Sequence, residues 1–238
     1  FLAVAWSDFF QGSLMFVGLL LLPVVAFFSI SGNESIISGL NEIDPGLLNP
    51  WGAGGLTLMN LMSVLGLLSI GIGFMGSPQV YVRFIAIRDE SEVEKGKWVA
   101  VIYTLLTDTA AVCIGLLGRY MLTRSGDNPE LILGTAGEDV LALVLGQVMP
   151  TIIIGIYIAA VLSAVMSTVD SLLVVASSAV TRDFYQKILN PQVDESKLMA
   201  LSKKVTITLA VLALVVALAV SVLSPTRTVF WFVIFGWS

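Results

Sequence analysis

The chain has 238 residues, of which 57% are hydrophobic and only 12% are charged, with a net charge of −5. A soluble domain carries about 25% charged residues, so this composition excludes an ordinary soluble globule and indicates an integral membrane protein. The sequence has no histidine and one cysteine, Cys113, which excludes histidine-based catalysis, histidine metal sites and an internal disulfide. No catalytic constellation is visible, so we expect neither an enzyme nor a nucleic-acid-binding protein.

Five apolar segments are long enough to cross a bilayer as helices, since a transmembrane helix needs about 20 apolar residues. None shows the alternation of barrel strands, so an all-α integral membrane protein is favoured. We expect spans at about 9–30, 56–77, 98–122, 150–181 and 201–223, with a truncated sixth at 228–238. Because the chain begins at Phe1 and ends in an apolar run, we expect residues 1–238 to be a single transmembrane-domain fragment of a longer polypeptide.

The basic residues are distributed unevenly among the loops. Four lie between the second and third spans: Arg83, Arg88, Lys95 and Lys97. Five lie between the fourth span and the first turn of the fifth: Arg182, Lys187, Lys197, Lys203 and Lys204. Because positively charged loops stay in the cytoplasm, the first and fifth spans are expected to run outward and the second and fourth inward. We expect a multi-pass protein of the plasma (inner) membrane, with the lipid bilayer as its immediate partner.

The stretch GIGFMGSP, Gly71–Pro78, contains the spacing G-x-G-x-x-G that cradles pyrophosphate in dinucleotide-binding folds. That interpretation needs a short strand before the glycines. The preceding run, LTLMNLMSVLGLLSI, is too long for a strand and suits a membrane helix. A second interpretation is that the glycines allow close helix packing.

A third interpretation of the same stretch is a broken transmembrane helix. Gly71, Gly73, Gly76 and Pro78 all disfavour regular helix, by about 1 kcal/mol for each glycine and about 3 kcal/mol for proline. A break frees backbone groups at membrane depth, which are tolerated only where they line a cavity or bind a ligand. Secondary transporters build solute sites in this way. We therefore expect the second span to be broken and to continue to about residue 88.

The stretch LSAVMSTVDS, Leu162–Ser171, carries small and hydroxyl residues at i, i+3, i+4 and i+7, which share one helix face: Ala164, Ser167, Thr168 and Ser171. Two hydroxyls and the Ala164 carbonyl oxygen would suit a hard cation such as sodium. Spacing alone leaves a second interpretation open. Serine and threonine hydroxyls also hydrogen-bond to their own helix and join helices to one another.

Three acidic residues lie within or beside the expected spans. Asp108 and Asp170 are candidates for ion or proton coupling, because acids inside a membrane are commonly functional. A structural hydrogen bond for Asp108, and a position facing the cytoplasmic vestibule for Asp170, are the alternatives. Asp8 lies at the inner mouth of the first span, where a plain interfacial charge is the alternative.

Several stretches together resemble the sodium:solute symporter family, and within it the sodium/proline symporter group. WSDFFQGSLM (Trp6–Met15) resembles the entry to the family's fifth core helix, and GIGFMGSPQVYVRFIAI (Gly71–Ile87) resembles the sixth. LSAVMSTVDSLLVVASSAVTRDFYQ (Leu162–Gln186) resembles the signature in the eighth, and the final FGWS resembles the start of the tenth. The resemblance implies an inverted-repeat transporter core of five plus five helices, of which this chain would hold helices 5 to 9 and the start of 10.

The resemblance also implies which residues handle sodium. The family's sodium site uses oxygens of the residues that match Ala164, Ser167 and Thr168, so sodium would be the coupling ion and the only metal bound. The aspartate that matches Asp8 lies on the intracellular sodium exit route. The remaining ligands come from core helix 1, expected in the missing N-terminal helices of the same polypeptide. This piece alone should therefore not transport, and no cofactor is implied.

For the solute, the proline group uses a tryptophan, a tyrosine and a proline of core helix 6, which Ile70, Phe74 and Pro78 match here. Ile70 and Phe74 depart from that pattern, which puts proline itself in doubt but leaves solute transport intact. Together with Gly71, these residues are expected to line the site of a small-molecule solute.

We therefore expect a symporter that couples inward sodium movement to uptake of a small organic solute, proline or a related amino acid. Sodium at its site would favour the outward-open state, and sodium release past Asp8 would free the inward-facing form. Two alternatives remain open. One is a sensor domain fused to a membrane histidine kinase, and the other is a symporter for another solute, such as pantothenate or a monocarboxylate.

Overall fold

The computed structural model describes residues 2–30, 35–51, 54–87 and 89–223. Over these ranges the chain is helical and contains no strand, which confirms the all-α prediction and removes the strand that a dinucleotide-binding loop requires. The expected sixth span at 228–238 and the FGWS match lie outside the described residues.

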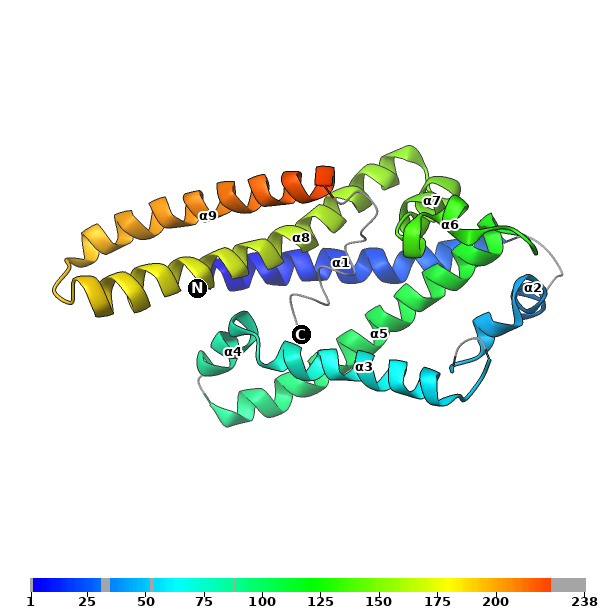
Figure 1. The fold of residues 1–238 in the computed structure, drawn as a ribbon. Helices are drawn as coiled ribbons and strands as arrows, with labels where there is room; N and C mark the ends of the chain where they lie inside the picture. Colours follow the sequence, from blue (N-terminus) through cyan, green and yellow to red (C-terminus); the bar gives the residue numbers. More distant parts are fainter. Residues whose placement is uncertain (1, 31–34, 52–53, 88, 224–238) are drawn as a thin grey trace.

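Five long helices carry the apolar segments. They are α1 (Leu2–Ser29), α3 (Leu58–Met75), α5 (Glu90–Leu122), α8 (Thr151–Ser178) and α9 (Glu195–Leu223), with a π-helical segment, Ala179–Leu189, after α8. By length and composition, these five regions are candidates to cross a membrane. In Figure 1, α1, α5 and α9 run one way along the bundle, and α3 and α8 run the other way.

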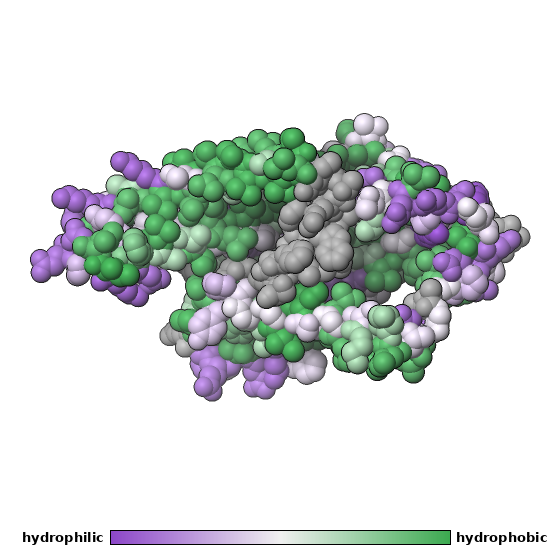
Figure 2. Space-filling model, viewed as in Figure 1, coloured by the Kyte–Doolittle hydropathy of each residue, from purple (hydrophilic) through white to green (hydrophobic). Residues whose placement is uncertain are grey.

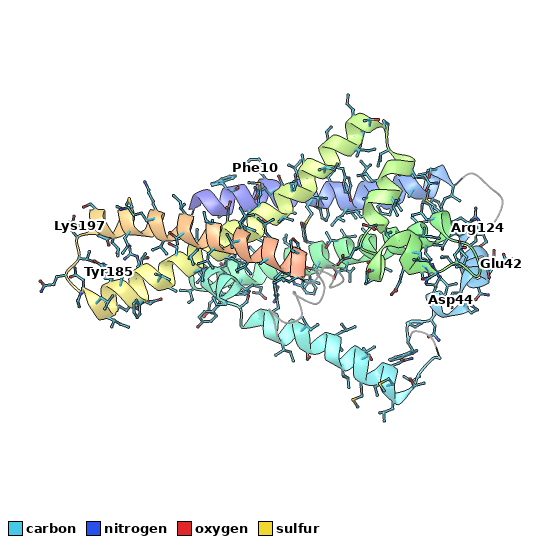
Figure 3. All side chains as sticks on the ribbon, turned by 45° about the horizontal axis from the view of Figure 1, so that its top comes forward. Phe10, Glu42, Asp44, Arg124, Tyr185 and Lys197 are labelled. Carbon is cyan, nitrogen blue, oxygen red and sulfur yellow. The ribbon has the colours of Figure 1, made fainter. Side chains whose placement is uncertain are left out.

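Shorter elements connect the long helices. They are α2 (Ile36–Ile43), a 3₁₀ turn (Pro45–Leu48), α4 (Pro78–Ile85), α6 (Pro129–Leu133), a second 3₁₀ turn (Thr135–Gly137) and α7 (Val140–Val148). The helices α2, α6 and α7 lie at one end of the bundle (Figure 1). Glu42, Asp44 and Arg124 lie at this end, and Tyr185 and Lys197 lie at the opposite end (Figure 3). The charge distribution predicts that the end with Lys197 faces the cytoplasm.

The buried core lies where α1, α5, α7 and α8 meet. Its apolar members are Leu22, Ala26, Ile114, Leu117, Leu133, Val140, Val144, Leu145 and Tyr157. Helix α7 therefore packs into the bundle with one face. Outside this core, apolar side chains cover the middle of the bundle, and hydrophilic residues gather towards its ends (Figure 2). This banding is what a bilayer requires of the protein it surrounds.

Gly118 on α5 allows α7 to approach closely. A Cβ added at Gly118 would lie 2.5 Å from Cγ1 of Val140 and 3.0 Å from Cγ2 of Val144. We expect Gly118→Val to destabilise the folded protein by about 1–3 kcal/mol through overpacking, seen as a lower unfolding temperature of the full-length protein in detergent. Gly115→Val is the matched control on the same helix, because a Cβ there meets no atom within 4 Å. Equal unfolding temperatures for the two variants would contradict this packing.

Candidate functional site

The three expected sodium ligands lie on one face of α8. The Ala164 carbonyl accepts hydrogen bonds from Ser167 Oγ at 2.9 Å and from Thr168 Oγ1 at 3.4 Å. Ala164 and Ser167 are half-buried, and Thr168 is exposed. We call these three oxygens the α8 oxygen group. These are the hydrogen bonds within one helix that the second interpretation of this stretch expects. They also bring all three oxygens to one point on the helix surface.

The α8 oxygen group has the chemistry of a partial cation site. A hydroxyl oxygen that donates one hydrogen bond keeps its lone pairs, so both hydroxyls can still offer oxygen to a cation. Hard cations prefer such oxygen ligands. Ligands from one helix leave the other side of an ion open, so a complete site needs oxygens from a second segment.

A second polar cluster joins three helices near the N-terminal end of α1. The Asp8 carboxylate oxygen Oδ2 pairs with Nη2 of Arg83 at 2.5 Å. The same Arg83 nitrogen donates to Ser171 Oγ at 2.8 Å, and Ser171 Oγ lies 3.5 Å from Asp8 Oδ2. We call Asp8, Arg83 and Ser171 the inner cluster. It links α1, α4 and α8, so residues that are far apart in the sequence meet at one point.

The inner cluster is partly withdrawn from water. The Asp8 side chain is 18% exposed, Ser171 is 8% exposed, and the Arg83 side chain is 54% exposed. The other carboxylate oxygen, Asp8 Oδ1, is buried and has no hydrogen-bond partner among the described residues. Gln11, one turn along α1, also has a buried oxygen, Oε1, without a hydrogen-bond partner among the described residues. Two buried acceptor oxygens at this end of α1 therefore have no donor among the described residues.

Contacts between α1 and its neighbours fix the position of Asp8. Tyr103 on α5 donates a hydrogen bond to the Gly12 carbonyl at 3.0 Å, and its ring stacks on Phe16 with 5.0 Å between centroids. Helix α1 also packs along α8. Asp8 is thus held one turn from an anchored segment, on a helix that already touches the helix carrying Ser171.

The expected solute residues lie at an interruption between α3 and α4. Helix α3 ends at Met75, Gly76 caps it, and Ser77 is extended with φ −69° and ψ 135°. Pro78 is the first residue of α4, and proline at that position forces the residue before it out of the helical region. Ser77 is 5% exposed, and its Oγ has no partner among the described residues.

Three of the expected solute residues precede this break. Ile70, Gly71 and Phe74 lie in the last turns of α3, where Ile70 is half-buried and Phe74 is 47% exposed. A Cβ added at Gly71 would meet no atom within 4 Å, so this glycine makes no close helix packing within the described residues. Helix α3 touches α4, and α4 touches α8, so the break is connected to α8 through α4.

The two other candidate acids differ from Asp8. Asp108 on α5 and Asp170 on α8 are both exposed, and no hydrogen bond or ion pair joins either side chain to another described residue. Thr107, next to Asp108, is buried and donates to the Tyr103 carbonyl at 3.0 Å. Roles for Asp108 and Asp170 in coupling stay predictions.

Sequence reasoning missed the part played by Arg83. Its charge was counted only as one of the cytoplasmic positive charges, yet it lies on α4 and binds Asp8, 75 residues earlier in the chain. Ser171 was predicted as the fourth residue of the polar face on α8, but the sequence did not indicate that Arg83 and Asp8 would be its partners. The only available signal was an arginine placed five residues after the helix-starting Pro78, on the same short helix.

Comparison with known proteins adds to this geometry. The model of the sodium:solute symporter family matches residues 1–238. The high-affinity proline transporter PutP of Bacillus subtilis (strain 168) is 32% identical over 224 residues, which cover 91% of this chain and 44% of that protein. The sodium/proline symporter of Escherichia coli (strain K12) is 27% identical over 241 residues, covering 100% of this chain and 45% of that protein.

A relative with a different named solute is equally similar. The sodium/pantothenate symporter of Haemophilus influenzae is 29% identical over 238 residues, covering 99% of this chain and 46% of that protein. No solved structure gives a significant match. The chain thus spans less than half the length of these curated relatives.

The family match covers every residue, and the relatives are carriers and not enzymes, as the sequence predicted. Together with five helices long and apolar enough to cross a bilayer, this makes the chain a multi-pass protein of the plasma membrane. The chain belongs to the sodium:solute symporter family.

Proposed function

We propose that this chain is part of a symporter that couples the inward movement of sodium to uptake of a small organic solute, with proline or a related amino acid as that solute. The observation that carries the proposal is the match of the sodium:solute symporter family to residues 1–238. The α8 oxygen group, with its hydroxyls 2.9 and 3.4 Å from the Ala164 carbonyl, the interrupted helix and the proline transporters among the relatives support it.

In this proposal, sodium binds to Ala164, Ser167 and Thr168 and completes its shell with oxygens from another segment of the full-length protein. The ion then bridges α8 to that segment and favours the outward-open state. Because α8 is connected through α4 to the break after α3, ordering α8 also orders the solute site. Solute and sodium thereby favour the same conformation, which is the thermodynamic requirement for coupling.

The break between α3 and α4 suits an amino acid in particular. The first turn of α4 lies at the partly positive end of its helix dipole, and the last turn of α3 lies at the partly negative end of its own. A zwitterion placed at Ser77 could direct its carboxylate to α4 and its ammonium group to α3. Ile70, Gly71, Phe74 and Pro78 would then form apolar walls around the rest of the solute. Secondary transporters use interrupted helices in this way.

Pantothenate is the second candidate solute. A sodium/pantothenate symporter matches 99% of the chain at 29% identity, close to the values for the proline carriers. Ile70 and Phe74 also lack the indole and hydroxyl found at the matching positions of the proline group. A solute with a carboxylate and no ammonium group, such as pantothenate, would use only the N-terminal end of α4. The C-terminal end of α3 would then have no charged partner.

Uptake by the full-length protein in liposomes tests the proposal. Labelled L-proline should accumulate with an inward sodium gradient and stop accumulating when choline replaces sodium. An excess of unlabelled pantothenate should leave that uptake unchanged. Sodium-dependent uptake of labelled pantothenate without proline uptake would move the assignment to the second solute, and uptake of either that ignores sodium would contradict coupling.

A further inference from the structure

We propose that Arg83 is an internal cation that closes the cytoplasmic end of the sodium path by occupying Asp8. The inference rests on the proposed function and adds a residue and a step to it. When the Arg83 guanidinium bridges Asp8 and Ser171, Asp8 is unavailable to sodium from the cytoplasm. When the guanidinium withdraws, sodium takes its place beside the carboxylate and leaves. Arg83 is thus a positioning residue that governs when the exit is open.

The charges of the inner cluster support competition between the two cations. Asp8 is mostly shielded from water, and a partly buried carboxylate needs a cation or donors beside it. Arg83 supplies one positive charge at 2.5 Å from Oδ2. A sodium ion at the same carboxylate would lie next to the guanidinium, and two like charges at that separation repel. Arginine and sodium therefore compete for Asp8, and each weakens the binding of the other.

The position of the inner cluster suits a gate on the path from the α8 oxygen group. Ser171 follows Ala164 by seven residues and shares its helix face, so it lies about 10 Å further along α8. That direction leads to the end of the bundle where Lys197 and Tyr185 lie, which the basic loops assign to the cytoplasm (Figure 3). A sodium ion that follows this face inward from Ala164 reaches Ser171 and Asp8 in turn.

Helix α4 connects the gate to the solute site. Pro78 begins α4 at the break, and Arg83 lies five residues later, about 7.5 Å along the same helix. Ser77 before α4 is extended, so α4 is a separate short rod and not a continuation of α3. A movement of α4 that accompanies solute release would carry Arg83 with it. Solute release and sodium release would then be coupled through one eight-residue helix.

A surface ion pair without function is the alternative to a gate, and exposed pairs of that kind contribute little. The chain offers such a pair for comparison. Arg182 lies 3.4 Å from Glu195 near the same end of the bundle, with side chains 55% and 69% exposed. Asp8 is far less exposed, and its arginine also binds a buried serine on a third helix. Arg182→Gln is therefore a matched control for Arg83→Gln.

Inhibition of uptake by internal sodium tests the gate in liposomes that contain the full-length protein in one orientation. In Arg83→Gln, Asp8 is free to hold cytoplasmic sodium, so the internal sodium concentration that halves labelled proline uptake should fall about five- to tenfold. The external sodium concentration for half-maximal uptake should change less than about twofold, because the α8 oxygen group is intact. Arg182→Gln should leave both values unchanged, and Arg83→Lys should stay near the wild type.

The double variant Asp8→Asn/Arg83→Gln separates the gate from a structural role. Without the carboxylate, the increased internal inhibition should disappear, whereas a merely structural Arg83 would give a double variant that is no better than the single one. If Arg83→Gln shows the wild-type internal inhibition, the gate is wrong. If the wild type itself shows no sodium-dependent uptake of any tested solute, the proposed function fails. The role of Arg83 as a gate is then tested by a measurement that needs no solute.

That measurement is the accessibility of Gln11→Cys in a background without other cysteines. Gln11 lies one turn beyond Asp8 on α1, is partly buried, and so reports on the opening of the inner cluster. In inside-out vesicles, a membrane-impermeant thiol reagent should label this cysteine at least about threefold faster when Arg83→Gln is added. Equal labelling rates for Gln11→Cys and for Gln11→Cys/Arg83→Gln would overturn the gate.

Discussion

Replacing Thr168 by alanine in the full-length protein should raise the sodium concentration for half-maximal solute uptake at least about tenfold. The change removes one oxygen of the α8 oxygen group, and a hydrogen-bonding group that acts on a charge contributes about 1.5–3 kcal/mol. Each 1.4 kcal/mol is a factor of about ten in affinity. Ser167→Ala should act in the same direction. The measurement is the initial rate of labelled proline uptake in liposomes over a range of external sodium concentrations.

Thr208→Ala is the matched control for this prediction. Thr208 lies on α9, is exposed, and donates to the carbonyl four residues earlier at 2.9 Å, so it makes the same kind of local hydrogen bond as Thr168. It should leave the sodium requirement unchanged. If Thr168→Ala and Thr208→Ala behave alike, the hydroxyl of Thr168 only serves its own helix, and sodium binds elsewhere.

Closing the break between α3 and α4 should reduce solute uptake at least about tenfold. The variant Gly76→Ala/Pro78→Ala removes the residue that caps α3 and the proline that holds Ser77 extended. Alanine is favoured in a helix by about 1 kcal/mol over glycine and about 3 kcal/mol over proline, so the two segments should join into one helix. The two helix ends whose partial charges are proposed to bind solute are then lost. Uptake and solute binding by the purified full-length protein measure the effect.

Pro129→Ala provides the control for this second prediction. Pro129 is also the first residue of a short helix, α6, which lies at the end of the bundle away from the break. Its replacement removes the same chemical constraint without touching the proposed solute site, and transport should persist. Wild-type uptake by Gly76→Ala/Pro78→Ala, with the protein intact, would show that the break does not form the solute site.

The apolar runs were enough to predict the long helices but not where they begin. The run that starts at Trp98 predicted a span at 98–122, yet α5 begins at Glu90. Asp89 caps it by accepting from the Ser91 N–H, and Glu90 and Glu92 occupy the first turn, where acids are favourable. A hydropathy pattern measures the length needed to cross a bilayer. It does not register polar turns that continue a helix into water.

The shared face of α8 was predictable because its residues lie on one helix. The period of 3.6 residues places Ala164, Ser167 and Thr168 together whatever the rest of the chain does. Their assignment to sodium came from the resemblance and stays a prediction. The inner cluster did not follow from spacing. Asp8 and Arg83 lie 75 residues apart and meet only because α1, α4 and α8 pack together. A single arginine near the membrane surface looks the same in the sequence in both cases. Its charge can set the orientation of the protein in the membrane, or its side chain can bind a carboxylate.

The central claim is that sodium and solute move together, and the most direct measurement is the influx of radioactive sodium triggered by solute. Liposomes containing the full-length protein would be given labelled sodium outside, first without solute and then with L-proline, pantothenate or lactate in separate samples. The account predicts that one of these solutes accelerates sodium entry, and that Thr168→Ala weakens this acceleration. Sodium entry that is the same with and without every solute, in protein that still takes up one of them, would contradict coupling.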